Sequence, residues 1–286
     1  MSAELAAEPT GGGVSTAMSM LAHHLSDRRP VGLEQVLSVA ELTTRVELKY
    51  ILPLASLPAF LQRLPHELAV LDIGGRRTFD YESVYFDTER FALYHQHVQG
   101  RRNRYKARVR SYCDSGDAMF EVKFKGRRGQ TVKARLPYDF RCRGELTPDG
   151  REFLDRVIAE AYGFTPPPLE PSLTTTYRRA TLVDMDRASR LTIDVNLGWS
   201  DRVSSHRAED LALIESKSLA GPGPADALLR SMGVRPVRIS KYCLGVALLH
   251  PDTAANPWNR LLNRQFAWQR TAEATPGGAH GPAPAP

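Results

Sequence analysis

The stretch RYKARVRSYC (residues 104–113) carries the charge pattern that decides the fold of this chain. Arg104, Lys106, Arg108 and Arg110 occupy every second position, and the residues between them are mostly apolar. Side chains alternate across a β-strand, so the stretch predicts a strand with one cationic face and one apolar face. The apolar face indicates burial against a core, and the cationic face needs either water or an anionic partner.

The same alternation recurs in RVELKY, VYFD, FEVKFK, TVKARL, RLTIDV and LIESKS. For any single strand, a charged face is most simply the solvent face of an antiparallel sheet. The repetition favours a different interpretation, because a solvent face usually mixes Thr, Ser, Gln and charges of both signs. Here the charged positions are mostly cations, punctuated by single carboxylates: Arg45, Glu47, Lys49, Asp87, Glu121, Lys123, Lys125, Lys133, Arg135, Arg190, Asp194, Glu215 and Lys217.

Segments with this alternation predict strands at 44–52, 81–88, 104–112, 118–125, 130–138, 174–183, 189–199 and 210–217. Helical spacing and start signals predict helices near 54–64, 89–98, 147–161, 224–232, 240–250 and 257–269. About eight antiparallel strands with helices around them are typical of an α+β protein. They also favour closure of the sheet into a β-barrel, or tunnel.

In a closed barrel one face of every strand points inward, so the apolar faces would pack on the outer helices and the charged faces would line the interior. An interior with so much like charge is unstable unless a polyanion neutralises it. Phosphate chains fit this requirement, because Arg and Lys side chains bind phosphate oxygens. The carboxylates Glu47, Glu121, Asp194 and Glu215 predict ligands for Mn²⁺ or Mg²⁺, which prefer oxygen.

The 286-residue chain has a formal net charge of +6, which indicates an anionic partner only weakly. Its three cysteines are widely spaced and indicate a reducing compartment. No apolar run approaches roughly 18 residues and no signal peptide is recognisable, so we expect a cytoplasmic protein without a membrane span. We expect a flexible N-terminal arm over residues 1–38, one continuous domain over 39–270 and a disordered tail over 271–286.

The motifs RVELKY, SVYFDT, RYKARVRSY, FEVKFK, RLTIDV, LIESKS and ISKYCLG occur in the order seen in the VTC domain, and the chain resembles that family from about residue 40 to 250. The VTC domain is the polyphosphate polymerase module of the triphosphate tunnel metalloenzyme (CYTH-like) superfamily. The resemblance implies a tunnel of antiparallel strands and metal-dependent transfer of the ATP γ-phosphoryl group onto growing inorganic polyphosphate. It implies ATP and polyphosphate as partners, and a bacterial stand-alone form of the domain.

The resemblance also implies site residues. Phosphate ligands are implied at Lys49, Arg108, Arg110, Lys123, Arg178 and Arg190, a metal ligand at Glu215, and a phosphate-contacting lysine on the last helix at Lys241. Lys49, Arg108, Arg110 and Lys241 are predicted to act in catalysis. Further phosphate contacts, by their position in the pattern, are Arg104, Lys106, Lys125, Lys133, Arg135 and Lys217.

Three alternatives stay open. The same tunnel could hydrolyse tripolyphosphate or a nucleoside triphosphate, although Arg45 replaces the first glutamate of the E-x-E-x-K motif that many triphosphatases carry. A non-catalytic module could bind polyphosphate or nucleotide through the same cations. A nucleic-acid binder would interleave aromatics with its cations, whereas Tyr105, Phe120 and Phe124 fall on the opposite side of their strands, so we expect no nucleic-acid partner. The oligomeric state cannot be read from the sequence.

Overall fold

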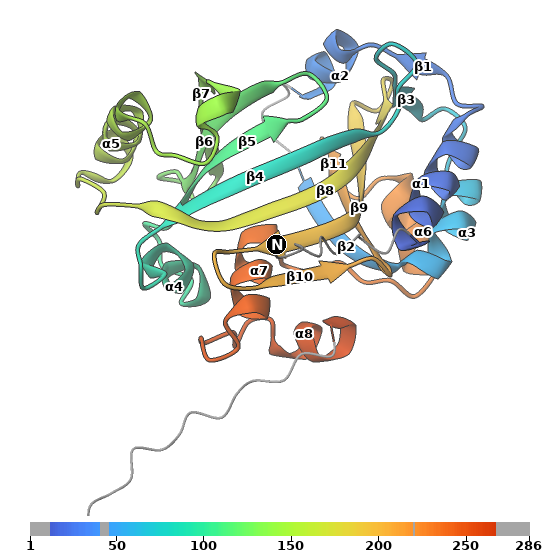
Figure 1. Ribbon diagram of the computed structural model, residues 1–286. Helices are drawn as coiled ribbons and strands as arrows, with labels where there is room; N and C mark the ends of the chain where they lie inside the picture. Colours follow the sequence, from blue (N-terminus) through green and yellow to red (C-terminus); the bar gives the residue numbers. More distant parts are fainter. Residues whose placement is uncertain (1–11, 41–45, 220, 267–286) are drawn as a thin grey trace, which may run out of the picture.

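The computed structural model of the protein describes residues 12–40, 46–219 and 221–266 (Figure 1). These residues form an 11-stranded sheet with helices packed around it, so the expected α+β class is confirmed. All strand pairs are antiparallel except that of β1 with β3.

Each expected strand is present within a few residues of its predicted bounds. In chain order the strands are β1 (Pro30–Val31), β2 (Val46–Pro53), β3 (Ala69–Leu71), β4 (Phe79–Asp87), β5 (Tyr105–Tyr112), β6 (Asp117–Lys125), β7 (Thr131–Tyr138), β8 (Glu170–Asp184), β9 (Ser189–Ser200), β10 (Ser205–Ala208) and β11 (Leu211–Ser218). The sequence analysis missed β1, β3 and β10, because strands of two to four residues are too short to show alternation.

The helices of the described residues are α1 (Gly12–Leu25), α2 (Leu33–Ala40), α3 (Leu57–Arg63), α4 (Ala92–Val98), α5 (Pro148–Tyr162), α6 (Pro224–Ser231), α7 (Lys241–Leu249) and α8 (Asn259–Phe266), with 3-10 turns at Leu54–Ser56 and Phe140–Cys142. Local signals explain several boundaries. Thr147 caps α5 by accepting from the Gly150 N–H, and Ser240 caps α7 by accepting from the Cys243 N–H.

The hydrogen-bonded path of the sheet runs β2-β11-β9-β8-β4-β5-β6-β7. Its eight strands agree with the expected number, but among the described residues no pairing joins β2 to β7, so the expected closure into a barrel is not seen. The outer edge of β2 is instead covered by the segment before α7, where the Val237 N–H donates to the Lys49 carbonyl at 2.7 Å. The sheet is curled, and β2 and β11 lie behind β8 and β9 in Figure 1.

The core is divided into clusters in which helices pack on both sides of the sheet. Helices α1, α3 and α6 pack on β2, β8, β9 and β11; α4, α7 and α8 pack on β4, β8 and β9; and α5 packs on β4, β5 and β6. Tyr105 and Phe120 are fully buried in the third cluster, beneath α5. The apolar strand faces of the first and third clusters therefore pack against helices, as expected. The second cluster instead contains Ile51, Tyr85 and Leu213, which lie on the same side of their strands as the charged positions.

The expectation of a flexible arm over residues 1–38 is wrong for the part that the structure describes. Residues 12–38 contain α1, β1 and most of α2. Leu21 and Leu25 have no exposed surface, and the buried Arg28 donates to the carbonyls of Leu61 and Leu64 at the end of α3. The sequence hides this because small residues weaken the helical period of α1, so burial of its few leucines is decided by tertiary packing.

The predicted tail, 271–286, lies outside the described residues, as does Arg45. The domain boundaries near residues 38 and 270 stay predictions. Within residues 12–40, 46–219 and 221–266, none of the helices combines the length and the apolar character needed to cross a membrane.

Candidate functional site

One face of the curled sheet gathers most of the charged positions singled out in the sequence. Strand register places them there: Tyr85 of β4 pairs with Arg108 of β5, Arg108 with Glu121 of β6, and Glu121 with Arg135 of β7. On the other side, Lys49 of β2 pairs with Glu215, and Lys217 pairs with Arg190 of β9. We call this surface the cationic face; its charged members are Glu47, Lys49, Lys106, Arg108, Arg110, Glu121, Lys123, Lys125, Lys133, Arg135, Arg179, Arg190, Asp194, Glu215 and Lys217.

The curl of the sheet brings strands that are distant in the pairing order into electrostatic contact. Lys123 lies on β6 and Glu215 on β11, with β9, β8, β4 and β5 between them in the sheet. Burial lowers the pKa of Lys123, and the Glu215 carboxylate nevertheless opposes that shift. Burial opposes ionisation of Glu215 in turn, but Lys123 is one of the cations that hold the pKa of Glu215 well below its usual range. The cationic face is therefore turned on itself rather than spread over a flat surface.

Arg108 and Glu121 form the centre of one charge cluster. The Arg108 guanidinium donates through Nε and Nη2 to Glu121 Oε2 at 2.9 and 2.6 Å, and through Nη1 to the Tyr85 hydroxyl at 2.7 Å. Lys133 pairs with the other Glu121 oxygen, and Glu121 is only 1% exposed. Burial opposes ionisation of Glu121, but Arg108, Arg110 and Lys133 outweigh it and hold its pKa well below the usual range.

Asp194 is the centre of a second charge cluster. Its carboxylate has no exposed surface and accepts from Arg179 of β8 at 2.6 and 2.9 Å and from Lys241 of α7 at 2.5 Å. The Tyr177 ring lies between the two cations, 5.1 Å from the Arg179 guanidinium carbon and 4.2 Å from Lys241 Nζ. Burial raises the pKa of Tyr177, but Arg110, Arg179 and Lys241 outweigh it and lower that pKa below 10.

Two half-buried cations of the cationic face have no carboxylate partner in the part of the chain described. Arg110 stacks over the Tyr81 ring at 5.8 Å and forms no ion pair, and its Nε has no hydrogen-bond partner. Lys123 likewise has no ion pair within hydrogen-bonding distance. Burial, with Arg108 and other cations, lowers the pKa of Lys123 well below 10.5. The site therefore holds positive charge that its own carboxylates do not neutralise.

Carboxylates and lysines alternate on β2 and β11. Lys217 Nζ lies 2.6 Å from Glu215 and 3.4 Å from Glu47, and Lys49 Nζ lies 3.4 Å from Glu215 and also pairs with Glu47. The Glu47 side chain is 41% exposed and that of Glu215 is 16% exposed. These two carboxylates are thus the accessible ones of the cationic face.

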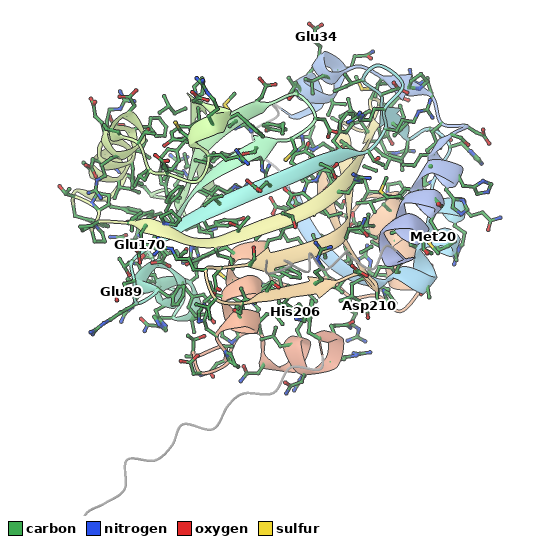
Figure 2. The ribbon with its side chains drawn as sticks, viewed as in Figure 1. Met20, Glu34, Glu89, Glu170, His206 and Asp210 are labelled. Atoms are coloured by element: carbon green, nitrogen blue, oxygen red, sulfur yellow. The ribbon has the colours of Figure 1, made fainter. Side chains whose placement is uncertain are left out.

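The four carboxylates predicted as metal ligands do not form one site. Glu121 and Asp194 are each buried and enclosed by the cations of their own cluster. Carboxylates that are exposed, such as Glu34 and Glu89, lie at the periphery of the molecule, away from the cationic face (Figure 2). Among the described residues no three His, Cys, Asp or Glu side chains gather as a metal site would require. Glu47 and Glu215 remain a pair of oxygen donors that fits a divalent cation only together with ligands from a bound molecule.

The structure does not bring Arg178 to the cationic face. It pairs with Asp80 on the opposite side of β8, with Nε 2.6 Å from Oδ1. The next residue, Arg179, takes the place expected of it. The strand pattern could have revealed this, because Arg178 shares its parity with the buried Ala180 and Leu182.

Other sequence-predicted residues lie nearer the edge of the cationic face. Arg104 precedes β5 and donates to the Gly100 carbonyl at 3.2 Å, and the Arg135 side chain is 59% exposed, 3.7 Å from Glu121. Lys125 donates to the Thr131 hydroxyl at 3.0 Å. The sequence analysis missed Arg179. The rings of Tyr81, Tyr85 and Tyr177 lie against the cations.

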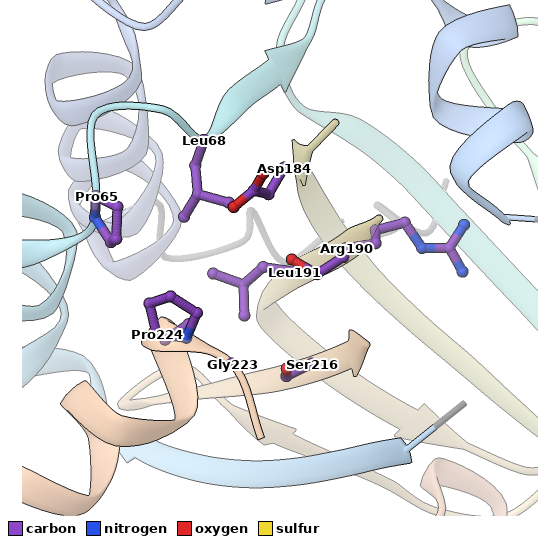
Figure 3. A pocket seen from close by; sticks show the side chains of 10 residues that line it. Pro65, Leu68, Asp184, Arg190, Leu191, Ser216, Gly223 and Pro224 are labelled. Atoms are coloured by element: carbon purple, nitrogen blue, oxygen red, sulfur yellow. The ribbon is translucent and has the colours of Figure 1, made fainter. Parts of the chain in front are cut away.

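A separate pocket lies where β9 and β11 meet the start of α6 (Figure 3). Pro65, Leu68 and Pro224 line it, and Arg190 stands at its edge with the guanidinium directed away from the prolines. The carboxylate in its lining, Asp184, already accepts from Arg187. The pocket is therefore part of helix–sheet packing and adds nothing to the chemistry of the cationic face.

Comparison with known families identifies the fold. The model of the VTC domain matches residues 44–250. The chain belongs to the VTC domain family. The match runs from the start of β2 to the end of α7, so every charged member of the cationic face lies inside the VTC domain, together with Lys241.

Several solved structures are similar in fold. One is a Hippeastrum protein named as an adenylyl cyclase candidate and described as having a dominant triphosphatase activity (14% identity, 71% of this chain and 96% of that chain, TM-score 0.44). Adenylate cyclase candidates from Vibrio parahaemolyticus (12%, 71% and 98%, TM-score 0.40) and Bacillus halodurans (13%, 69% and 94%, TM-score 0.37) are also similar. No curated protein matches the chain.

Proposed function

We propose that this VTC domain is a polyphosphate polymerase, which transfers the γ-phosphoryl group of ATP onto the end of a growing polyphosphate chain and releases ADP. Membership of the VTC family supports the proposal. The observation that carries it is the gathering of cations on one curled sheet face, above all the half-buried Arg110 and Lys123, which form no ion pair within the described residues. Partly desolvated charge without a partner is unfavourable, so an anion of high charge density that occupies this face would stabilise it.

The proposed phosphate contacts are the cations of the cationic face. Arg110 and Lys123 have no ion-pair partner within the described residues, whereas Arg108 and Arg179 are held by Glu121 and Asp194. Lys49, Arg190 and Lys217 extend the surface on β2, β9 and β11, and Lys133, Arg135, Lys106 and Lys125 extend it on β5, β6 and β7. Lys241 adds a cation from α7, held by Asp194. Arg179 replaces the originally expected Arg178 in this set.

Phosphoryl transfer requires in-line positioning and charge neutralisation more than covalent participation by the protein. An oxygen of the terminal phosphate of the chain attacks the γ-phosphorus of ATP. The bond from that phosphorus to the β–γ bridging oxygen breaks, and ADP leaves with the electron pair. The attacking oxygen is already anionic near neutral pH, so the mechanism needs no general base. The guanidinium groups of Arg108, Arg110 and Arg179 orient the phosphates and lower the repulsion between the two anions.

A divalent cation, Mn²⁺ or Mg²⁺, would be held by Glu215 and Glu47 together with phosphate oxygens of the substrate. When bound, it would supply further neutralisation of the triphosphate charge. Lys49 and Lys217, which pair with these carboxylates in the free protein, would then be available to phosphate.

We extend the proposal to a tunnel: the curled sheet, with the segment around Val237 along the edge of β2, surrounds the phosphate chain. The electrostatic contact of Lys123 with Glu215 supports this arrangement. Cytoplasmic location is proposed from the three cysteines, which are all free. ATP and polyphosphate are the proposed partners, without nucleic acid.

The test is to incubate the purified protein with ATP and Mn²⁺ or Mg²⁺ and to resolve the products by ³¹P NMR. Mid-chain phosphate resonances that appear with ADP, and that are lost in Glu215→Gln and Arg110→Gln, are the expected result. Glu82→Gln is the matched control, because Glu82 pairs with Arg143 on the opposite side of β4. Orthophosphate as the only product would identify a hydrolase instead. Binding of polyphosphate without turnover of ATP would refute the proposed enzymatic activity.

A further inference from the structure

Two arginine-rich loops lie just beyond one end of the cationic face. The loop from α4 to β5 carries Arg101 and Arg102, and the hairpin from β6 to β7 carries Arg127 and Arg128. All four side chains belong to exposed residues. We call them the basic loops. The proposed reaction assigns them no role.

Pairing of the strands brings the two loops together. Tyr105 at the start of β5 pairs with Phe124 near the end of β6. Beyond this pair, the Arg102 guanidinium donates to the Arg127 carbonyl at 3.0 Å. The arginines of both loops therefore form one surface rather than two separate ones.

This surface continues the cationic face without a break in charge. The first inner neighbours are Lys106, which pairs with Lys123, and Lys125. Burial, followed by Arg104 and Lys106, lowers the pKa of Lys125, and burial with these same cations lowers the pKa of His97 to about 3. The cations at this end are therefore close enough to lower the pKa of their neighbours.

The two ends of β5 and β6 differ in how their charge is compensated. At the opposite end, around the turn after β5, Asp114 pairs with Arg76 and Asp80 pairs with Arg178. At the end of the basic loops, no ion pair to a carboxylate is present within the described residues. An uncompensated basic surface of this kind fits a polyanion and attracts it over long range.

We propose that the basic loops bind the part of a polyphosphate chain that extends out of the cationic face, and so retain long chains during synthesis. This inference rests on the proposed function for the identity of the ligand. The distance explains why length matters. Lys106 is four strand residues from Arg110, roughly 13 Å, and the basic loops lie farther out. A tripolyphosphate bound at Arg108 and Arg110 does not extend to them, whereas a long chain does.

The test compares the full chain with a variant that carries Arg101→Gln, Arg102→Gln, Arg127→Gln and Arg128→Gln. Binding of tripolyphosphate and of long-chain polyphosphate is measured by calorimetry at fixed salt. We expect roughly tenfold weaker binding of the long chain, since each exposed ion contact contributes little alone but four act together. Tripolyphosphate affinity should stay within about twofold. Products made from ATP should become shorter.

The matched control lowers the net charge by the same amount elsewhere, with Arg29→Gln, Arg63→Gln, Arg202→Gln and Arg230→Gln, which are exposed on other parts of the fold. Equal long-chain affinity in the basic-loop variant and this control would overturn the inference. So would an equal loss for tripolyphosphate, or a loss seen only with single-stranded RNA or anionic vesicles.

Failure of the proposed function is distinguishable from failure of this inference. A protein that makes no polyphosphate but binds long chains through the basic loops refutes the polymerase and keeps the inference. A protein that makes polyphosphate with unchanged length and affinity in the variant does the reverse.

Discussion

Individual lysines of the cationic face differ in how easily they keep their protons. Lys133 is the clearest case, because burial lowers its pKa to about 7, with Arg110 and Arg108 adding to the effect and Glu121 opposing it. The free protein thus holds Lys133 partly neutral at physiological pH. A phosphate chain supplies the negative charge that restores the proton.

We therefore predict that tripolyphosphate binding takes up a proton above pH 7 and weakens as pH rises from about 7 to 9, by up to about tenfold per pH unit. Calorimetry in buffers of different ionisation enthalpy measures the uptake. Lys133→Arg, which stays charged throughout, should flatten the dependence. An identical profile in wild type and Lys133→Arg would contradict the assignment.

Lys133 also makes the free energy of unfolding depend on pH. The unfolded chain keeps the Lys133 proton up to about pH 10.4, whereas the folded chain loses it near pH 7. Between these values the unfolded state binds more protons, so the contribution of Lys133 makes the free protein more stable as pH rises. Bound phosphate removes this contribution by restoring the charge.

At the scale of elements, Asp194 joins two strands to a helix, since it lies on β9 and binds Arg179 of β8 and Lys241 of α7. We predict that Asp194→Asn lowers the free energy of unfolding by about 3–5 kcal/mol, because two buried cations lose their counter-charge. Bound tripolyphosphate should recover part of this loss. Thermal unfolding should then show a larger ligand-induced rise in Tm than in wild type.

Asp184→Asn is the control for this prediction. Asp184 is also buried, but it binds Arg187 within the turn that joins β8 to β9. Its loss should lower Tm without increasing the rise that ligand causes. Equal ligand-induced rises in both variants would show that Asp194 has no electrostatic link to the ligand.

Helix α1 contributes to the core through leucines that the sequence pattern understates. We predict that Leu21→Ala destabilises the protein by about 2–5 kcal/mol, as expected for a fully buried leucine. Leu37→Ala on α2, where the side chain is 45% exposed, should change stability by less than about 0.5 kcal/mol. Chemical denaturation measures both. No effect of Leu21→Ala would restore the interpretation of this segment as a mobile arm.

For the whole molecule, the alternation within strands was sufficient to predict the eight long strands and their cationic face. It works because one side of β5 and β6 packs on α5, which forces a strict inside–outside pattern. It cannot show which strands form the ends of the sheet, because closure depends on edge pairing far apart in the sequence. In the structure the hydrogen-bonded order of the strands is open, with β2 and β7 at its two ends.

The candidate site was predictable in composition but not in pairing. Most of the expected cations share one face, yet Arg178 does not, because a register irregularity beside it and the parity of Ala180 put Arg179 there instead. The sequence also gave no sign that Glu121 and Asp194 are enclosed by cations. Partner choice depends on the curl of the sheet, which brings residues from distant strands together.

Arg178 and Arg179 provide the most direct test of the central claim, that the cationic face binds phosphate chains. They are adjacent and chemically identical, but they lie on opposite sides of β8. Calorimetric titration of tripolyphosphate into Arg179→Gln should show roughly 10- to 100-fold weaker binding, as expected for the loss of a charge-assisted contact, while Arg178→Gln stays within about twofold of wild type. Circular dichroism confirms that both variants are folded. Equal losses, or a greater loss in Arg178→Gln, would contradict the claim.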